Sequence, residues 1–186
     1  GLGDVYKRQD LRRRQVSPAR VGALLLSFLF CVTAPMVLLA NPKYAAMVMD
    51  ARSGEILHSE NANKRLHPAS LTKMMTLYVV FQAVENGEIS LDKKVKISRH
   101  AASEPPSKLG LRPGQKVRLR YLIRAAAVKS ANDAATALGE AIEGSEAAFA
   151  RRMNRTAKAM GMNRTTFKNA HGLTESGHLS TARDMT

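Results

Sequence analysis

Ser70 and Lys73 are the residues whose types and spacing first suggest chemistry. They lie in the run PASLTKMMT (68–76), at the start of a strongly apolar segment. Residues three apart on a helix share a face, so the hydroxyl and the amine could exchange a proton. Burial in an apolar helix and the positive end of the helix dipole both lower the pKa of a lysine. We therefore predict a Ser70 nucleophile with a neutral Lys73 amine as its base.

The S-x-x-K pattern alone is weak, because a chain of this length contains about one copy by chance. A second copy, Ser90 to Lys93, follows Gly87 and leads into an alternating strand, so its two side chains need not share a face. The plainer alternative for the first copy is that Ser70 caps a helix and Lys73 points outward.

A second polar motif is Ser130-Ala131-Asn132, which falls between two Ala-rich helical segments, 57 residues after Lys73. From this place a loop can reach back to the start of another helix. A similar triplet, Ser59-Glu60-Asn61, lies close upstream beside a predicted hairpin, and we exclude it on that context. The alternative for Asn132 is that it caps the helix that follows it.

The elements that must position these residues follow from the hydrophobic pattern. The segment 70–84 predicts a helix that is buried on most sides, with Lys73 as its only charge and Gly87 beyond its end. Strands are expected at 45–50, 55–58 and 94–98, the first two as a hairpin. A loop is expected at 103–114, helices at 118–128, 133–142 and 146–160, a strand or extended loop at 165–167, and a turn at 171–173. We expect Ser145 to cap the last helix and Gly161 to end it.

The first forty residues have the layout of a secretory signal. A basic segment precedes residues 21–40, which carry no charge. We predict cleavage near Ala40 and export, with residues 41–186 as one domain; residues 1–9 could be foreign. Retention of the span as a membrane anchor is the alternative. The single cysteine, Cys31, lies in this span, which excludes a disulfide or thiol mechanism in the exported part, and we expect no cofactor and no metal.

The chain is strongly basic, with a formal net charge of +14, and the part after residue 40 is basic in its own right. An exported basic protein suits an acidic wall polymer or anionic lipid, although a merely solvated basic surface explains the charge equally well. Nucleic acid is not expected, because the basic residues are dispersed, aromatic residues make up 5%, and no nucleic-acid-binding signature is present.

Ser70-Leu71-Thr72-Lys73 followed by Ser130-Ala131-Asn132 resembles the active-site serine penicillin-recognising enzymes. The runs NPKYAA (41–46), PASLTKMMT (68–76), SANDAA (130–135) and HGL (171–173) are similar to the serine-type D-alanyl-D-alanine carboxypeptidases, which are low-molecular-weight penicillin-binding proteins of peptidase family S11. The resemblance runs from about residue 41 to the end of the sequence. It implies an α/β (α+β) fold, in which a mainly antiparallel sheet flanked by helices meets a helical subdomain at a cleft.

The resemblance also implies roles. Ser70 would attack the bond between two terminal D-alanines of a peptidoglycan pentapeptide, Lys73 would act as base, Ser130 would relay a proton, and Asn132 would bind the substrate backbone. β-Lactams would acylate Ser70, and the exported protein would act in the periplasm or at the outer face of the bacterial cytoplasmic membrane. The family's third element, a K-T-G strand, is absent from these residues, so we expect the 186-residue chain to be a truncated and inactive fragment with an open sheet edge prone to aggregation. Ala131, where class A β-lactamases have Asp, argues against efficient β-lactam hydrolysis.

Two other functions stay open. A D,D-endopeptidase that cuts cross-links would use the same serine motifs. A non-catalytic exported protein could instead bind acidic wall polymer or the membrane through its basic surface.

Overall fold

The computed structural model describes residues 43–186, which fall within one compact unit, Pro42–Thr186. The predicted signal segment 1–40, with Cys31, lies outside the described residues, and the predicted division at residue 40 stays a prediction. The elements are β1 (Ala46–Met49), β2 (Ile56–Glu60), the 3-10 helix η1 (Ala69–Leu71), α2 (Thr72–Glu85), β3 (Lys94–Lys96), α3 (Arg99–Ser103), β4 (Lys116–Arg118), α4 (Leu119–Val128), α5 (Asn132–Glu143), α6 (Glu146–Ala159) and α7 (Ala182–Met185).

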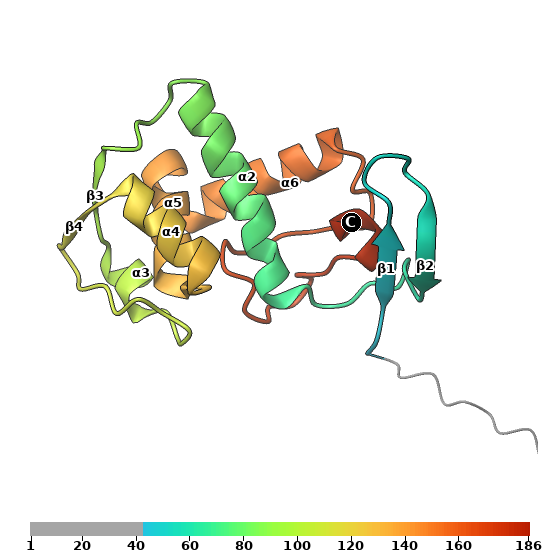
Figure 1. The fold of residues 1–186 in the computed structure, drawn as a ribbon. Coiled ribbons are helices and arrows are strands. Elements are labelled where there is room, and N and C mark those ends of the chain that lie inside the picture. Colours follow the sequence, from blue (N-terminus) through green and yellow to red (C-terminus); the bar gives the residue numbers. More distant parts are fainter. Residues whose placement is uncertain (1–42) are drawn as a thin grey trace, which may run out of the picture. The chain divides into compact units, whose positions relative to one another are not determined.

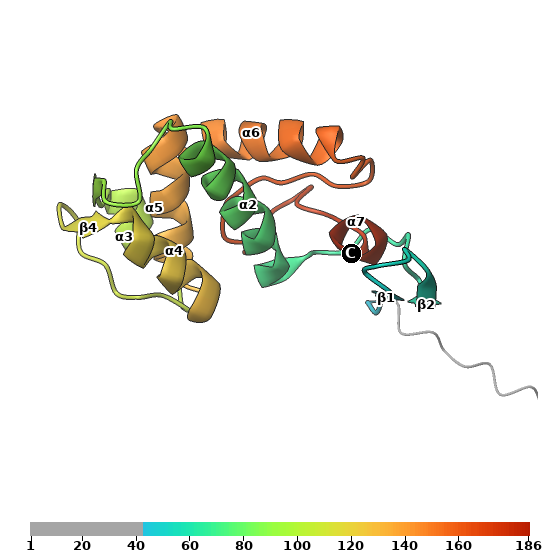
Figure 2. The same ribbon diagram turned by 45° about the horizontal axis from the view of Figure 1, so that its top comes forward.

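Helix α2 packs against α4, α5 and α6, and these four helices enclose the core (Figures 1 and 2). Val79 and Val80 of α2 are fully buried, as are Leu122, Leu138 and Phe149 of its three neighbours. Small residues permit the close contacts: a Cβ on Gly139 of α5 would lie 2.8 Å from a ring carbon of Phe149. The three predicted helices after residue 118 are therefore confirmed, and the Ser145 hydroxyl caps α6 by accepting a hydrogen bond from the Ala148 N–H.

The prediction that the first long helix is buried on most sides is wrong for one face of α2. Met74, Tyr78 and Phe81 are 42–56% exposed, because no element within residues 43–186 covers them. The apolar pattern runs around the helix, but α4, α5 and α6 cover only part of that circumference. No helix in the described part of the chain is long and apolar enough to cross a membrane.

The strands form two small antiparallel pairs among the described residues. β1 pairs with β2, which confirms the predicted hairpin; Asp50 stabilises its turn by accepting hydrogen bonds from the Arg52 and Ser53 N–H groups. β3 pairs with β4, which lies between the loop predicted at 103–114 and the helix predicted from 118 and is not a predicted strand. α3 was not predicted either. Both missed elements are only three to five residues long, too short for a periodic pattern to form.

The segment after α6 returns to the start of α2 without regular structure. Isolated bridges join Leu66 to Ser180 and Thr166 to Leu179, and the Arg183 N–H donates to the Ala62 carbonyl. The predicted extended stretch at 165–167 is thus part of a bridge rather than a strand. The segment after α6 brings the turn 171–173 to the N-terminal end of α2, where this turn is drawn in red in Figure 1.

Candidate active site

Lys73 is the centre of the site. Its side chain is 3% exposed, and Nζ donates hydrogen bonds to Asn132 Oδ1 at 2.8 Å and to the His171 carbonyl at 2.7 Å. Burial lowers the pKa of Lys73 to about 8, and the negative charge of Glu104 partly opposes that fall. The alternative in which Lys73 points outward into solvent is therefore wrong.

Asn132 is the first residue of α5, and its side chain does not cap that helix. The cap position belongs to Ala131, whose side chain makes no hydrogen bond. The Asn132 amide instead bridges two segments: Oδ1 accepts from Lys73, and Nδ2 donates to the Pro105 carbonyl at 2.9 Å. The capping alternative for Asn132 is therefore wrong, because the side chain turns away from its own helix end toward the buried amine.

Ser70 and Ser130 lie at the start of α2 and of α5. Ser70 is exposed within η1, and the caps of η1 and α2 use no side chain, so the helix-cap alternative for Ser70 is wrong as well. Ser130 is half-buried, with a left-handed backbone φ of 55°. Within residues 43–186 neither hydroxyl makes a hydrogen bond, and none joins Ser70 Oγ to Lys73 Nζ. The structure brings Lys73 and Asn132 together and leaves both hydroxyls without a protein partner among these residues.

The turn at His171 and Gly172 packs directly on the backbone that carries Ser70. Gly172 has a φ of +90°, and a Cβ there would lie 1.9 Å from the Ala69 carbonyl oxygen. Only glycine fits, both in conformation and in space. The sequence pattern does not indicate the His171 carbonyl as a lysine partner; the glycine beside a histidine in an expected turn is the signal that points to this contact.

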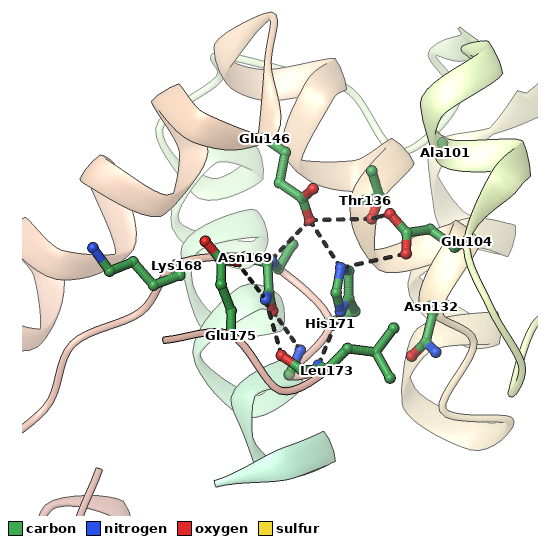
Figure 3. Close-up of polar contacts among 12 residues, drawn as sticks. Ala101, Glu104, Asn132, Thr136, Glu146, Lys168, Asn169, His171, Leu173 and Glu175 are labelled. Carbon is green, nitrogen blue, oxygen red and sulfur yellow. Dashed lines mark hydrogen bonds and ion pairs between the residues drawn. The ribbon is translucent and has the colours of Figure 1, made fainter. Parts of the chain in front are cut away.

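A polar cluster is formed by the buried Glu104 and His171, the half-buried Glu146 and the exposed His100; Figure 3 shows the first three. His171 Nε2 is 3.4 Å from Glu104 Oε2 and 3.5 Å from Glu146 Oε1, and the Thr136 hydroxyl donates to both carboxylates at 3.2 Å. Burial lowers the pKa of His171, whereas the hydrogen bond to Glu146 raises that of His100. The four cluster residues line a pocket of about 610 Å³.

Three members of this cluster, His100, Glu104 and Glu146, place possible metal-ligand atoms within 4.8 Å of one another. Each oxygen of the two carboxylates already has a protein partner. The oxygens of Glu104 face Thr136, His100 and His171, and those of Glu146 face His100, His171 and the Ala170 N–H. The geometry is that of an internally paired charge cluster. The sequence reading singled out none of these acids, because only the fold joins segments 100–104, 146 and 171.

The two excluded motifs lie away from the site. Ser90 Oγ accepts a hydrogen bond from the Asp92 N–H in an exposed turn, and Lys93 is exposed. Ser59 and Asn61 are exposed as well, at the end of the β1–β2 hairpin. Both copies therefore lie in exposed segments, and their exclusion from the catalytic site stays a prediction.

The comparisons with known proteins agree with this fold. Residues 37–186 match the Peptidase S11 family model, described as D-alanyl-D-alanine carboxypeptidase. The chain therefore belongs to the peptidase S11 family, and the fold class expected from the resemblance is confirmed.

Named relatives and solved structures are similar over most of the described chain. D-alanyl-D-alanine carboxypeptidase DacF of Bacillus subtilis is 38% identical over 183 residues, which is 93% of this chain and 46% of DacF. The crystal structure of DacD from Francisella tularensis has a TM-score of 0.73 at 45% identity and covers 76% of this chain and 34% of that one. Penicillin-binding protein D2 of Listeria monocytogenes, in its cefotaxime-bound form, has a TM-score of 0.67 at 37% identity, covering 79% and 60%. The chain spans less than half the length of DacF.

Proposed function

We propose that the protein carrying this chain is a serine D,D-carboxypeptidase, which removes the terminal D-alanine from peptidoglycan stem peptides. The observation that carries this proposal is the buried Lys73 amine. A neutral amine has two N–H groups and one lone pair; Asn132 Oδ1 and the His171 carbonyl take up both N–H groups. The lone pair is left free to accept a proton from a hydroxyl such as that of Ser70, one turn earlier on the chain.

In the proposed reaction, Ser70 Oγ attacks the carbonyl of the penultimate D-alanine while Lys73 Nζ takes its proton. The Ser70 N–H supplies one donor to the developing oxyanion. Ser130 relays this proton from the Lys73 ammonium to the leaving amine, the C–N bond breaks, and free D-alanine departs. The Asn132 amide, already oriented by Pro105, binds the substrate backbone. Water then hydrolyses the Ser70 ester and restores the hydroxyl.

The proposal includes the partners and the location. We infer that β-lactams acylate Ser70, as the cefotaxime-bound form of the Listeria relative suggests by analogy. Peptidoglycan lies outside the cytoplasmic membrane, so the substrate fits the export that the signal-like residues 1–40 predict. Membrane association and the cleavage position near Ala40 stay predictions, as does the absence of any role for nucleic acid.

Labelling with a fluorescent penicillin tests the reaction centre. We expect no labelling of the 186-residue chain, because it contains no K-T-G segment to supply the rest of the oxyanion and carboxylate site. A longer protein that combines this chain with a K-T-G segment should be labelled, and Ser70→Ala should abolish the label. Ser90→Ala, which alters the serine of the other S-x-x-K copy, is the matched control and should keep it. Labelling that survives Ser70→Ala would refute the proposal.

Product analysis separates the remaining functions. A carboxypeptidase releases D-alanine from pentapeptides, whereas an endopeptidase converts cross-linked muropeptide dimers into monomers. The relatives named above include D-alanyl-D-alanine carboxypeptidases, which favours the first product. A non-catalytic wall-binding or membrane-binding protein would keep its function in the Ser70→Ala variant.

A further inference from the structure

Both groups that hold the Lys73 amine are linked to Glu104 and its neighbour. Asn132 Nδ2 donates to the carbonyl of Pro105, the next residue in the chain. His171, whose carbonyl accepts from Lys73, places its ring Nε2 3.4 Å from Glu104 Oε2. Glu104 itself is 6% exposed at the end of α3, where a carboxylate is costly unless it has a structural or functional purpose.

We propose that Glu104 is a positioning residue of the Lys73 site: its carboxylate holds the His171 ring, and its charge acts on the amine without touching it. The inference that Glu104 adjusts the pKa of a catalytic base depends on the proposed function. The electrostatic interaction between Glu104 and Lys73 does not depend on it.

The hydrogen-bond pattern explains how a carboxylate can act through His171. The Leu173 N–H donates to His171 Nδ1, so the ring proton lies on Nε2 and faces the two carboxylates. Thr136 fixes Glu104 and Glu146 from the α5 side (Figure 3). With its ring held in this way, the His171 backbone presents its carbonyl to Lys73.

The charges around Lys73 determine in which direction its pKa should move when the Glu104 charge is removed. Glu104, Glu146, His171 and His100 face one another beside the amine, and Glu140 lies near His100. Of these groups, Glu104 is the one that raises the pKa of Lys73 against the effect of burial. Loss of its charge should therefore lower that pKa below about 8 and increase the neutral fraction of the amine at pH 7. Simple loosening of the structure would hydrate the lysine and move its pKa the other way.

Carbon-13 NMR of a longer protein that combines this chain with a K-T-G segment, labelled at lysine, tests this directly. The Lys73 side-chain signal is assigned by its loss in Lys73→Met, and its shift is followed with pH. In Glu104→Gln we expect the midpoint to fall by about half a unit or more. The matched control is Glu146→Gln, which removes the other carboxylate of the cluster, equally close to the His171 ring, and should leave the Lys73 midpoint near that of the wild type.

Glu104→Asp keeps the charge but withdraws it by one methylene, so its Lys73 midpoint should lie between those of the wild type and Glu104→Gln. Circular dichroism shows whether each variant is folded. If Glu104→Gln does not fold, the midpoint of Glu104→Asp is used for the test instead. An unmoved or raised midpoint in the folded variants overturns the role of Glu104. Because the titration needs no activity, it can be read even if penicillin labelling fails, and labelling without a midpoint change refutes only the Glu104 inference.

Discussion

Lys73 Nζ lies 2.8 Å from Asn132 Oδ1, although 59 residues separate the two along the chain. This contact joins the start of α2 to the start of α5 and determines where the buried amine points. Because the contact is buried away from water, a charge introduced at position 132 would strongly change the pKa of Lys73.

The variant Asn132→Asp should therefore lose most of its acylation activity at neutral pH. The new carboxylate would stand beside the Lys73 amine and raise its pKa by about 1–3 units, so the lysine stays protonated and cannot act as a base. Penicillin labelling at pH 7, measured on a protein that combines this chain with a K-T-G segment, should fall at least about tenfold and recover in part at higher pH. Equal loss at every pH would point instead to loss of substrate binding.

The acylation rate should depend on pH through Lys73. Because the neutral amine is the active form and burial lowers the pKa to about 8, the rate should rise as the pH increases through about 8. Stopped-flow measurement of acylation between pH 5 and 10 checks this. Lys73→Arg should remove the rise, since a guanidinium stays protonated throughout. A rate that is flat across pH 8 would contradict a lysine base.

Gly172→Ala should disrupt the packing of the turn on the Ser70 segment. The new Cβ would collide with the Ala69 carbonyl, which adds about 1–3 kcal/mol of overpacking, or more, to about 1–2 kcal/mol of backbone strain. Gly177→Ala is the matched control: it has a similar positive φ, and its Cβ meets only the flexible Lys168 side chain at 3.3 Å. Urea unfolding should show a clearly larger loss of stability for Gly172→Ala, and equal losses would rule out the steric argument.

Asp133→Ala should loosen the loop beside the site. The buried carboxylate accepts hydrogen bonds from three consecutive backbone N–H groups, those of Leu109, Gly110 and Leu111. Hydrogen bonds to a charged group contribute about 1.5–3 kcal/mol each, so unfolding free energy should fall by several kcal/mol. Hydrogen exchange should speed up first at residues 109–111. Unchanged protection there would show that the loop is held by other contacts.

Stability should decline in mild acid because of His178. The folded ring is buried with its pKa lowered to about 4, while the unfolded chain binds a proton near pH 6.5. The unfolded state therefore gains a proton that the folded state refuses, and stability should fall as the pH drops from about 6.5 to 4. Thermal melts of His178→Gln should show a flatter decline over this range. His58→Gln, on the exposed strand β2, should behave like the wild type.

Local pattern was enough to predict several parts of the fold. The apolar run after Ser70, the Ser145 cap and the hairpin each depend on residues within a few positions of one another, so they can be read from the sequence. The sequence context also distinguished the two S-x-x-K copies, because Ser70 precedes the long helix α2 whereas Ser90 lies in an exposed turn. It missed β4 and α3, which pack too few residues to leave a pattern.

The sequence by itself determined that a serine and a lysine stand one turn apart at the head of an apolar helix. Only the tertiary structure decided that the lysine is buried, that Asn132 and the His171 carbonyl hold it, and that Glu104 acts on it. The physical reason is that desolvation and charge depend on which distant segments pack together. Helix spacing is a property of neighbours in the chain, whereas the protonation of Lys73 depends on residues 31 to 98 positions away.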